Sequence, residues 1–302
     1  MNADRPLIGI ALMIGFCAVA PMGDATAKLL GATIPLFQLL LVRFVAQAAL
    51  LFPLVWASGR PLAMSRRVLA LTTVRTFLHM GGIAAMFTAL RFLPLADAVA
   101  IAFVMPFIML LLGRMVLGEE VGPRRLAACA VGFAGTLLVV QPSFAEVGTP
   151  ALLPLAVAVI FAFYMLVSRQ IAKHADPIAL QAVSGLIAAA IFAAMLAANQ
   201  WLDIGALHLV TPDRREIALL AVIAVLGTLA HLLMTWSLRF APSATLAPIQ
   251  YFEIPFATLI GWLVFFDLPN GLAAIGIAIT MAAGLYIVYR ERRTVQPVPP
   301  EV

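Results

Sequence analysis

Ten stretches of mostly apolar residues follow one another along the chain and leave little of it for anything else. Each is about 20 residues long, which is the length of a helix that crosses the roughly 30 Å hydrocarbon core of a bilayer. The chain is 64% hydrophobic and 11% charged, with a mean hydropathy of +1.06, whereas soluble domains carry about 25% charged residues. We therefore predict an all-α integral membrane protein with ten transmembrane helices, at residues 7–27, 34–56, 68–89, 93–113, 125–141, 150–169, 177–199, 216–238, 242–265 and 270–289.

The second half of the chain repeats the first. Residues 89–107 read ALRFLPLADAVAIAFVMPF and residues 237–256 read SLRFAPSATLAPIQYFEIPF, so that Arg91 matches Arg239 at an offset of 148 residues. Each half holds five predicted spans, which is an odd number, so the second half must enter the membrane from the opposite side. Inverted repeats of this kind are typical of membrane transporters.

The repeat also defines the predicted domain organisation. We predict two inverted five-helix repeats with short flanking ends, in this order: a cytoplasmic N-terminus at 1–6, the first repeat at 7–141, the second repeat at 150–290 and a disordered cytoplasmic tail at 291–302. The tail is polar and rich in proline, a composition that cannot bury enough apolar surface to fold.

Positive charges are distributed unequally between the two predicted faces. With the N-terminus in the cytoplasm, thirteen Lys and Arg residues flank the spans on the cytoplasmic side, and four lie on the other side, at Lys28, Arg91, Arg214 and Arg215. Positive charges are retained preferentially in the cytoplasm. We therefore predict a multi-pass protein of the cell inner (plasma) membrane with both termini cytoplasmic, and no nucleic-acid partner.

A few polar side chains fall within the apolar spans. A charge at the bilayer centre costs roughly 2.5–3.5 kcal/mol on insertion scales, so such residues are candidates for function. We assign substrate binding to six of them, namely Arg43, Arg75, His79, Gln250, Tyr251 and Glu253. We assign gating or ion coupling to three more, namely Asp24, Lys28 and His231.

Three of these residues determine the charge of the expected cavity. Arg43 lies about midway along the second span, Arg75 lies on the third, and Glu253 lies near the centre of the ninth. Together they would give a cavity with two positive charges and one negative charge. That combination suits a substrate with at least one anionic group, either an anion or a zwitterion.

Structural roles are open alternatives for the charged residues. Asp24 and Lys28 lie four residues apart and can pair with each other on one helix face. Arg75 can extend its long side chain back to the cytoplasmic interface. Arg43 and Glu253 can form an ion pair that needs no substrate.

The remaining candidates have alternatives of the same kind. His79 and His231 can be buried histidines that serve only packing. Pro21 and Pro248 can either break their helices, which would expose backbone to a substrate, or merely kink them.

Several motifs together resemble the drug/metabolite transporter superfamily, in its EamA-type ten-helix branch. They are spread over residues 7–290 and read Asp24-Ala-Thr-Ala-Lys28, Val42-Arg43-Phe44, Ala89-Leu-Arg-Phe-Leu-Pro94, Pro106-Phe107, Leu117-Gly-Glu-Glu120 and Gly132-Phe-Ala-Gly135. The resemblance implies two five-helix EamA repeats, cytoplasmic termini, and export or uptake of small metabolites by alternating access.

Arg43, Arg75 and the segment Tyr251-Phe252-Glu253 are further similar to a subgroup of that superfamily, which includes S-adenosylmethionine uptake transporters and riboflavin transporters. The third span departs from the subgroup at His79, and the ninth span departs from it just before Tyr251. The resemblance therefore implies a transporter but does not identify the substrate.

The predicted function is secondary transport of a small polar organic metabolite across the inner membrane by alternating access. An anionic or zwitterionic compound is expected, such as an amino-acid derivative or an S-adenosylmethionine-like or flavin-like molecule. The chain has no Walker A loop, so ATP does not power it directly. The expected partners are this small molecule and the lipid bilayer, with a homodimer left open; no cofactor or metal is implied.

Two other function classes are weighed against transport. An intramembrane enzyme would need a nucleophile with a base, or a metal cluster, and the sequence has neither an HExxH motif nor paired intramembrane aspartates. A non-transporting membrane scaffold would use its buried polar residues only to pair with one another. The enzyme alternative gives no reason for an inverted repeat.

Overall fold

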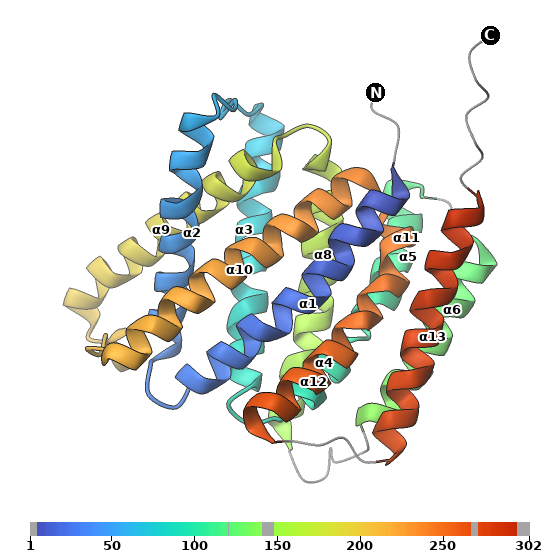
Figure 1. The fold of residues 1–302 in the computed structure, drawn as a ribbon. Coiled ribbons are helices and arrows are strands. Elements are labelled where there is room, and N and C mark those ends of the chain that lie inside the picture. Colours follow the sequence, from blue (N-terminus) through green and yellow to red (C-terminus); the bar gives the residue numbers. More distant parts are fainter. Residues whose placement is uncertain (1–4, 120, 141–147, 267–270, 295–302) are drawn as a thin grey trace.

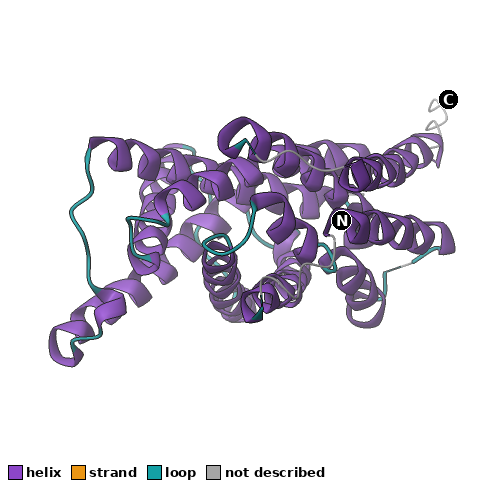
Figure 2. Cartoon of the chain, turned by 90° about the horizontal axis from the view of Figure 1, so that it is seen from below, coloured by secondary structure: helices purple, strands orange, loops and turns teal. Residues whose placement is uncertain are grey.

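The protein is an all-helical bundle, as the sequence predicts. The computed structural model describes residues 5–119, 121–140, 148–266 and 271–294, and every regular element within them is a helix (Figure 2). The first half contains α1 (Pro6–Leu30), α2 (Leu36–Ala57), α3 (Arg66–Ala89), α4 (Leu95–Ala102), α5 (Met105–Leu117) and α6 (Pro123–Val140). The second half contains η1 (Thr149–Ala151), α8 (Leu152–Ala172), α9 (Pro177–Leu202), η2 (Gly205–Leu207), α10 (Arg214–Phe240), α11 (Ser243–Leu246), η3 (Ala247–Phe252), α12 (Glu253–Phe265) and α13 (Gly271–Thr294).

These helices occupy the ten predicted spans. Eight helical segments within the described residues are long and apolar enough to cross a membrane, and they coincide with the first four predicted spans and with the sixth to the ninth. Helices α6 and α13 occupy the positions of the fifth and tenth spans. Helix α13 continues to Thr294, into the segment predicted as a disordered tail, and the rest of that tail lies outside the described residues.

Polar residues between the spans begin the helices that follow them. The hydroxyl of Ser65 accepts a hydrogen bond from a backbone N–H in the first turn of α3. The carboxylate of Asp176 accepts two such bonds at the start of α9 and also pairs with Arg60. Asp213 and Glu216 form a capping box at the start of α10. Each cap satisfies backbone donors that a helix leaves without partners at its N-terminus.

The fourth and ninth spans are each broken near the middle, at corresponding places in the two repeats. Helix α4 ends at Ala102 and α5 begins at Met105. The ninth span passes from α11 through the 3-10 helix η3 into α12, with Pro248 in the first turn of η3. Proline has no N–H and its ring clashes with the preceding turn, which interrupts an α-helix. Pro21, in contrast, lies inside the continuous helix α1.

The two halves interlock rather than sit apart. Figure 1 shows α2 with α9 at one edge of the bundle, α6 with α13 at the other, and α1, α10, α3 and α8 between them. In the repeat, α1 corresponds to α8, α2 to α9, α3 to α10 and α6 to α13. The contact of α1 with α10 therefore corresponds to the contact of α8 with α3, while the α2–α9 and α6–α13 contacts each correspond to themselves. The arrangement therefore has an approximate two-fold relation between the repeats.

Small residues let these helices approach closely. A Cβ atom added at Gly185 of α9 would lie 2.9 Å from the backbone nitrogen of Ala48 in α2. A Cβ atom added at Gly9 of α1 would lie 2.5 Å from the Cβ of Ala241, just after α10. Since lipid tails are as apolar as the side chains, close van der Waals contact of this kind is a main source of helix association in membranes.

Candidate functional site

A pocket lies between the two halves, and its lining includes the C-terminal halves of α1 and α3 and the N-terminal half of α8. Helices α1, α2, α3, α4 and α5 line it from the first half, and α8, α10 and α12 line it from the second. Its empty space is about 730 Å³, including the part open to the outside, and the centres of water molecules could occupy about 80 Å³ of it. Ligand pockets typically measure about 300–1,000 Å³, so the enclosed part of this pocket is smaller than a typical ligand site.

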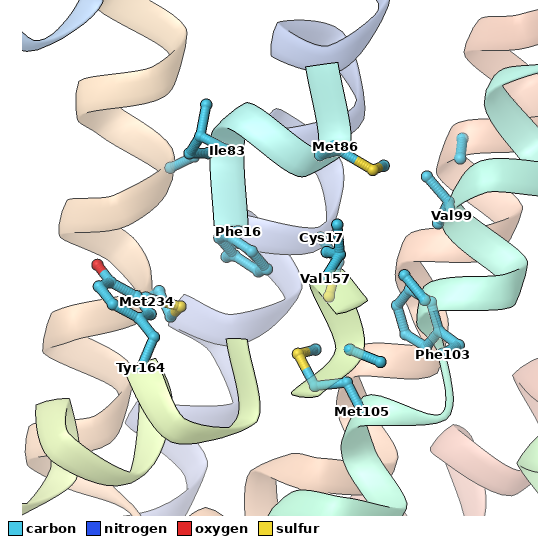
Figure 3. Packing of buried hydrophobic residues seen from close by; sticks show 14 of the residues in the cluster. Phe16, Cys17, Ile83, Met86, Val99, Phe103, Met105, Val157, Tyr164 and Met234 are labelled. Carbon is cyan, nitrogen blue, oxygen red and sulfur yellow. The ribbon is translucent and has the colours of Figure 1, made fainter. Parts of the chain in front are cut away.

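Apolar side chains form most of the wall. Figure 3 shows Phe16, Met86, Val99 and Val157 converging from four different helices. Four phenylalanines in all belong to the lining, at positions 16, 87, 103 and 161. Such a wall suits a substrate with an apolar or aromatic body.

Three ionisable side chains enter this wall from different helices. Asp24 comes from α1, Arg43 from α2, and Glu253 is the first residue of α12. The Arg43 side chain donates from Nη2 to the carbonyl oxygen of Gly227 at 3.1 Å, and its Nη1 has no hydrogen-bond partner among the described residues. No ion pair within the described residues joins any two of the three. Together with His231, which also lines it, the pocket therefore carries two carboxyl groups, one guanidinium and one imidazole.

Arg75 lies outside the pocket lining, in a separate polar network. Its Nε donates to Ser168 (2.8 Å), its Nη1 to Ser184 (2.9 Å), and its Nη2 to Tyr164 (2.6 Å) and Thr235 (3.1 Å). The side chain is fully buried and lies 4.6 Å from the centre of the Tyr164 ring. It therefore does not extend to the interface; it joins α3 to three helices of the second half.

The two buried histidines lie next to each other between the pocket and this network. His231 lines the pocket, and its Nδ1 is 3.3 Å from the hydroxyl of Tyr164. The His79 ring centre is 4.0 Å from that of His231, and its two nitrogens have no hydrogen-bond partner among the described residues. Phe44 packs edge-on against His79 at 5.0 Å. His79 thus supports the pocket from behind rather than lining it.

Gln250 and Tyr251 lie on η3 and also face away from the pocket lining. The Tyr251 hydroxyl donates to the carbonyl oxygen of Cys129 in α6 at 3.0 Å. The Gln250 amide lies 3.5 Å from the sulfur of Met109 in α5. Both residues are fully buried. In this conformation they attach the broken ninth span to its neighbours.

Lys28 and Asp24 do not form the ion pair that their spacing allows. The Lys28 amine donates to the carbonyl oxygen of Leu93 at 2.5 Å and lies 5.4 Å from the centre of the Phe265 ring. Lys28 thus connects the end of α1 to the loop before α4 and to α12. Asp24 is left facing the pocket.

A cluster of polar contacts closes the bundle at the end where α1 starts and α13 ends (Figure 1). The Glu119 carboxylate accepts hydrogen bonds from the backbone N–H groups of Ser243 and Ala244, at 3.2 and 3.0 Å, and from the Ser243 hydroxyl. Arg169 pairs with the same carboxylate at 3.3 Å and donates to the carbonyl of Leu238 at 2.6 Å. We call Glu119, Arg169 and Ser243 the clamp. It joins the end of α5 to α8 and α11 across the two repeats.

The acceptors of Arg75 are not among the site residues predicted from the sequence. Tyr164 and Ser168 lie four residues apart in an otherwise apolar span, and that spacing places them on one helix face. A polar pair at this spacing is the signal that would have identified them. The phenylalanines of the pocket wall carry no comparable signal, because aromatic residues are common throughout the spans.

Known proteins that are similar to this chain share its architecture. The chain matches the EamA-like transporter family over residues 7–141 and 149–290. A solved crystal structure of a protein that shares 21% sequence identity superposes with a TM-score of 0.70, covering 96% of this chain and 98% of the other. That likeness concerns the fold alone.

Curated relatives are named as transporters. A riboflavin transporter of Rhizobium johnstonii is 29% identical over 219 residues, covering 72% of this chain and 70% of the relative. An S-adenosylmethionine uptake transporter of Rickettsia bellii is 24% identical over 293 residues, with 95% of each chain covered. A pseudopaline exporter of Pseudomonas aeruginosa is 27% identical over 290 residues, covering 95% of this chain and 96% of the relative.

Proposed function

This chain belongs to the EamA-like transporter family of the drug/metabolite transporter superfamily, and from that premise we propose that it moves a small polar organic metabolite across the inner membrane by alternating access. The observation that carries the proposal is the pocket between the two repeats, in which Asp24, Arg43 and Glu253 face one another without an ion pair. Charged groups held within a membrane bundle mark substrate and ion pathways.

A substrate explains why these charges are kept. Without one, they raise the free energy of the folded protein, because buried charges are costly unless they are paired or hydrogen-bonded. A polar metabolite in the pocket supplies the missing partners. The space available to water centres, about 80 Å³, is small for an amino-acid derivative or a flavin, so binding is expected to accompany some widening of the pocket.

The arrangement of clamp and pocket supports alternating access. The clamp joins the two repeats at the end of the bundle where α1 begins (Figure 1), whereas the pocket is lined by the C-terminal half of α1. With both termini in the cytoplasm, as the distribution of positive charge predicts, the cytoplasmic side is the closed one here. Transport would require the clamp to open while the outer side closes around the substrate.

Counterflow in proteoliposomes tests the proposal. Vesicles containing the purified protein are preloaded with unlabelled S-adenosylmethionine, riboflavin or an amino-acid mixture, and the accumulation of the matching labelled compound is followed. We expect one preload to drive accumulation and the variants Arg43→Gln and Glu253→Gln to reduce it by about tenfold or more, as for the loss of a charge-assisted hydrogen bond. Arg66→Gln, at an exposed arginine outside the pocket, is the matched control.

The negative result is equally informative. Absence of counterflow with every preload and with a wider metabolite panel, from protein shown to be folded and inserted, would sink the transport proposal. Turnover of a lipid or peptide by the same pure protein would instead support the intramembrane enzyme. The inner-membrane location and the cytoplasmic termini are tested separately, by labelling single cysteines at both ends in intact and permeabilised cells.

A further inference from the structure

Asp24, Arg43 and Glu253 reach the pocket from separate helices, and no ion pair within the described residues joins any two of them. Arg43 is 1% exposed and Glu253 is 8% exposed, on α2 and α12, and Asp24 is partly exposed on α1. The carboxylates of Asp24 and Glu253 have no hydrogen-bond or ion-pair partner within the described parts of the chain. A pocket that keeps opposite charges apart can bind opposite charges on one ligand.

Arg43 is held in a position that leaves part of its guanidinium unused. Its Nη2 donates to the carbonyl of Gly227, and its buried Nη1 has no partner among the described residues. Gly227 permits this approach, since a Cβ atom there would lie 2.6 Å from Nε of Arg43. The guanidinium is therefore seated against bare backbone of α10 with a donor left for an anionic group, and carboxylate is the anion whose geometry it matches best.

Asp24 and Glu253 form the opposite half of the site. Both are acidic and both line the same pocket, where Arg43 supplies the one guanidinium of the described lining and His231 supplies an imidazole. Two carboxylates that line one poorly solvated pocket repel, so a cationic group beside them lowers the free energy. The four phenylalanines of the wall add faces on which a cation or an aromatic ring can lie.

We infer that the pocket has two subsites of opposite charge, so that the transported molecule carries an anionic group, bound by Arg43, and a cationic group, bound by Asp24 and Glu253, on an apolar or aromatic body. This substrate class rests on the proposed transport function and narrows it. It favours zwitterions and compounds of net positive charge, and it disfavours dianions and uncharged molecules.

A matched set of three indole compounds tests the inference directly. L-Tryptophan carries both an ammonium and a carboxylate, tryptamine carries only the cation, and indole-3-propionate carries only the anion. Binding to the purified full-length protein in nanodiscs is measured by calorimetry. We expect tryptophan to bind about tenfold or more tightly than either singly charged analogue, which is the effect of one charge-assisted contact.

Substitutions then assign each ligand group to its subsite. Asp24→Asn and Glu253→Gln are expected to weaken the binding of tryptophan and tryptamine about tenfold. The affinity for indole-3-propionate should remain unchanged. Arg43→Gln is expected to weaken the binding of tryptophan and indole-3-propionate and to leave the affinity for tryptamine unchanged. Gly227→Ala should resemble Arg43→Gln because it displaces the guanidinium, whereas Gly81→Ala, where nothing lies within 4 Å of the added Cβ, is the control.

Three results would overturn the inference: equal affinity for all three compounds, variants that weaken all three alike, or no measurable binding of any. The transport proposal is separated from this outcome by the counterflow assay. If an uncharged compound such as riboflavin shows counterflow, and neutralising Asp24 or Glu253 leaves that flux intact, the proposed function stands and the two-subsite inference falls.

Discussion

Arg43 and Arg75 show how differently one residue type behaves at two buried positions. Arg43 has a single hydrogen bond, to the Gly227 carbonyl, and lines the pocket. Arg75 donates to four hydroxyl groups and is closed off from the pocket. A positive charge with a full set of acceptors maintains structure, whereas a positive charge with a donor to spare is suited to bind a ligand.

Arg75→Lys is expected to lower the free energy of unfolding by about 3 kcal/mol. A lysine ammonium has only three donors, in a tetrahedral arrangement, and cannot replace the planar fork that reaches Ser168, Ser184, Tyr164 and Thr235. Losing partners for buried polar groups costs about 1–3 kcal/mol each time. The measurement is denaturant unfolding in detergent micelles, with Arg43→Gln as the comparison variant. A loss of stability in the Arg43 variant equal to that in the Arg75 variant would contradict the division of roles.

The sequence predicted the positions of the eight helical segments that are long and apolar enough to cross a membrane, because they depend on local hydropathy. It could not assign roles to the buried charges. The acceptors of Arg75 lie 89 to 160 residues further along the chain, and only the folded arrangement of the two repeats brings them together. For the same reason Asp24, expected to gate or couple, turns out to face the pocket, and Arg75, expected to bind substrate, does not.

At the scale of single elements, the ends of α5 and α12 correspond in the two repeats, but a glycine at one end is replaced by a phenylalanine at the other. The backbone of that phenylalanine is strained. Each helix ends in a residue with left-handed backbone, Gly118 at φ 64° and Phe266 at φ 60°. The two positions are related by the same offset of 148 residues that relates Arg91 to Arg239. Glycine adopts this conformation without a steric penalty, while a residue with a Cβ atom pays about 1–2 kcal/mol.

Phe266→Gly is expected to stabilise the protein by up to about 1 kcal/mol by relieving this strain, and Gly118→Ala to destabilise it by about 1 kcal/mol by introducing it. Unfolding midpoints in detergent provide the measurement. Gly122→Ala is a suitable control, because its φ is not in the left-handed range and an added Cβ meets nothing within 4 Å. The same sign of change in the Phe266 and Gly118 variants would rule out backbone strain as the cause.

At the scale of the whole molecule, the clamp is the contact that must break if the two repeats move against each other. Glu119 accepts from the first turn of α11 and pairs with Arg169 of α8, so one carboxylate holds two elements of the second repeat. The sequence repeat pairs Glu119 with Asp267, which lies outside the described residues. An inverted duplication would place the counterpart of the clamp at the opposite membrane face.

Replacing the clamp by a reversible covalent bond is expected to stop transport. In the double variant Glu119→Cys with Ser243→Cys, oxidation should reduce counterflow to the level of empty vesicles, and reduction should restore it. The native thiols of Cys17 and Cys129 are buried, so each single variant serves as the control for oxidation itself. Full counterflow in the cross-linked double variant would show that the clamp stays closed throughout the cycle.

The four hydroxyl groups that accept hydrogen bonds from Arg75 also affect how the protein is synthesised and inserted. All four of its acceptors belong to the second half, and the last of them, Thr235, lies 160 residues after it. A ribosome that adds about 5–20 residues per second needs roughly 8–32 seconds to cover that distance. Until the end of this interval the guanidinium of Arg75 lacks at least one of its four acceptors in the bilayer. Membrane proteases and insertion chaperones therefore meet a half-made chain with an incompletely satisfied guanidinium, and a chain that stalls before α10 keeps it.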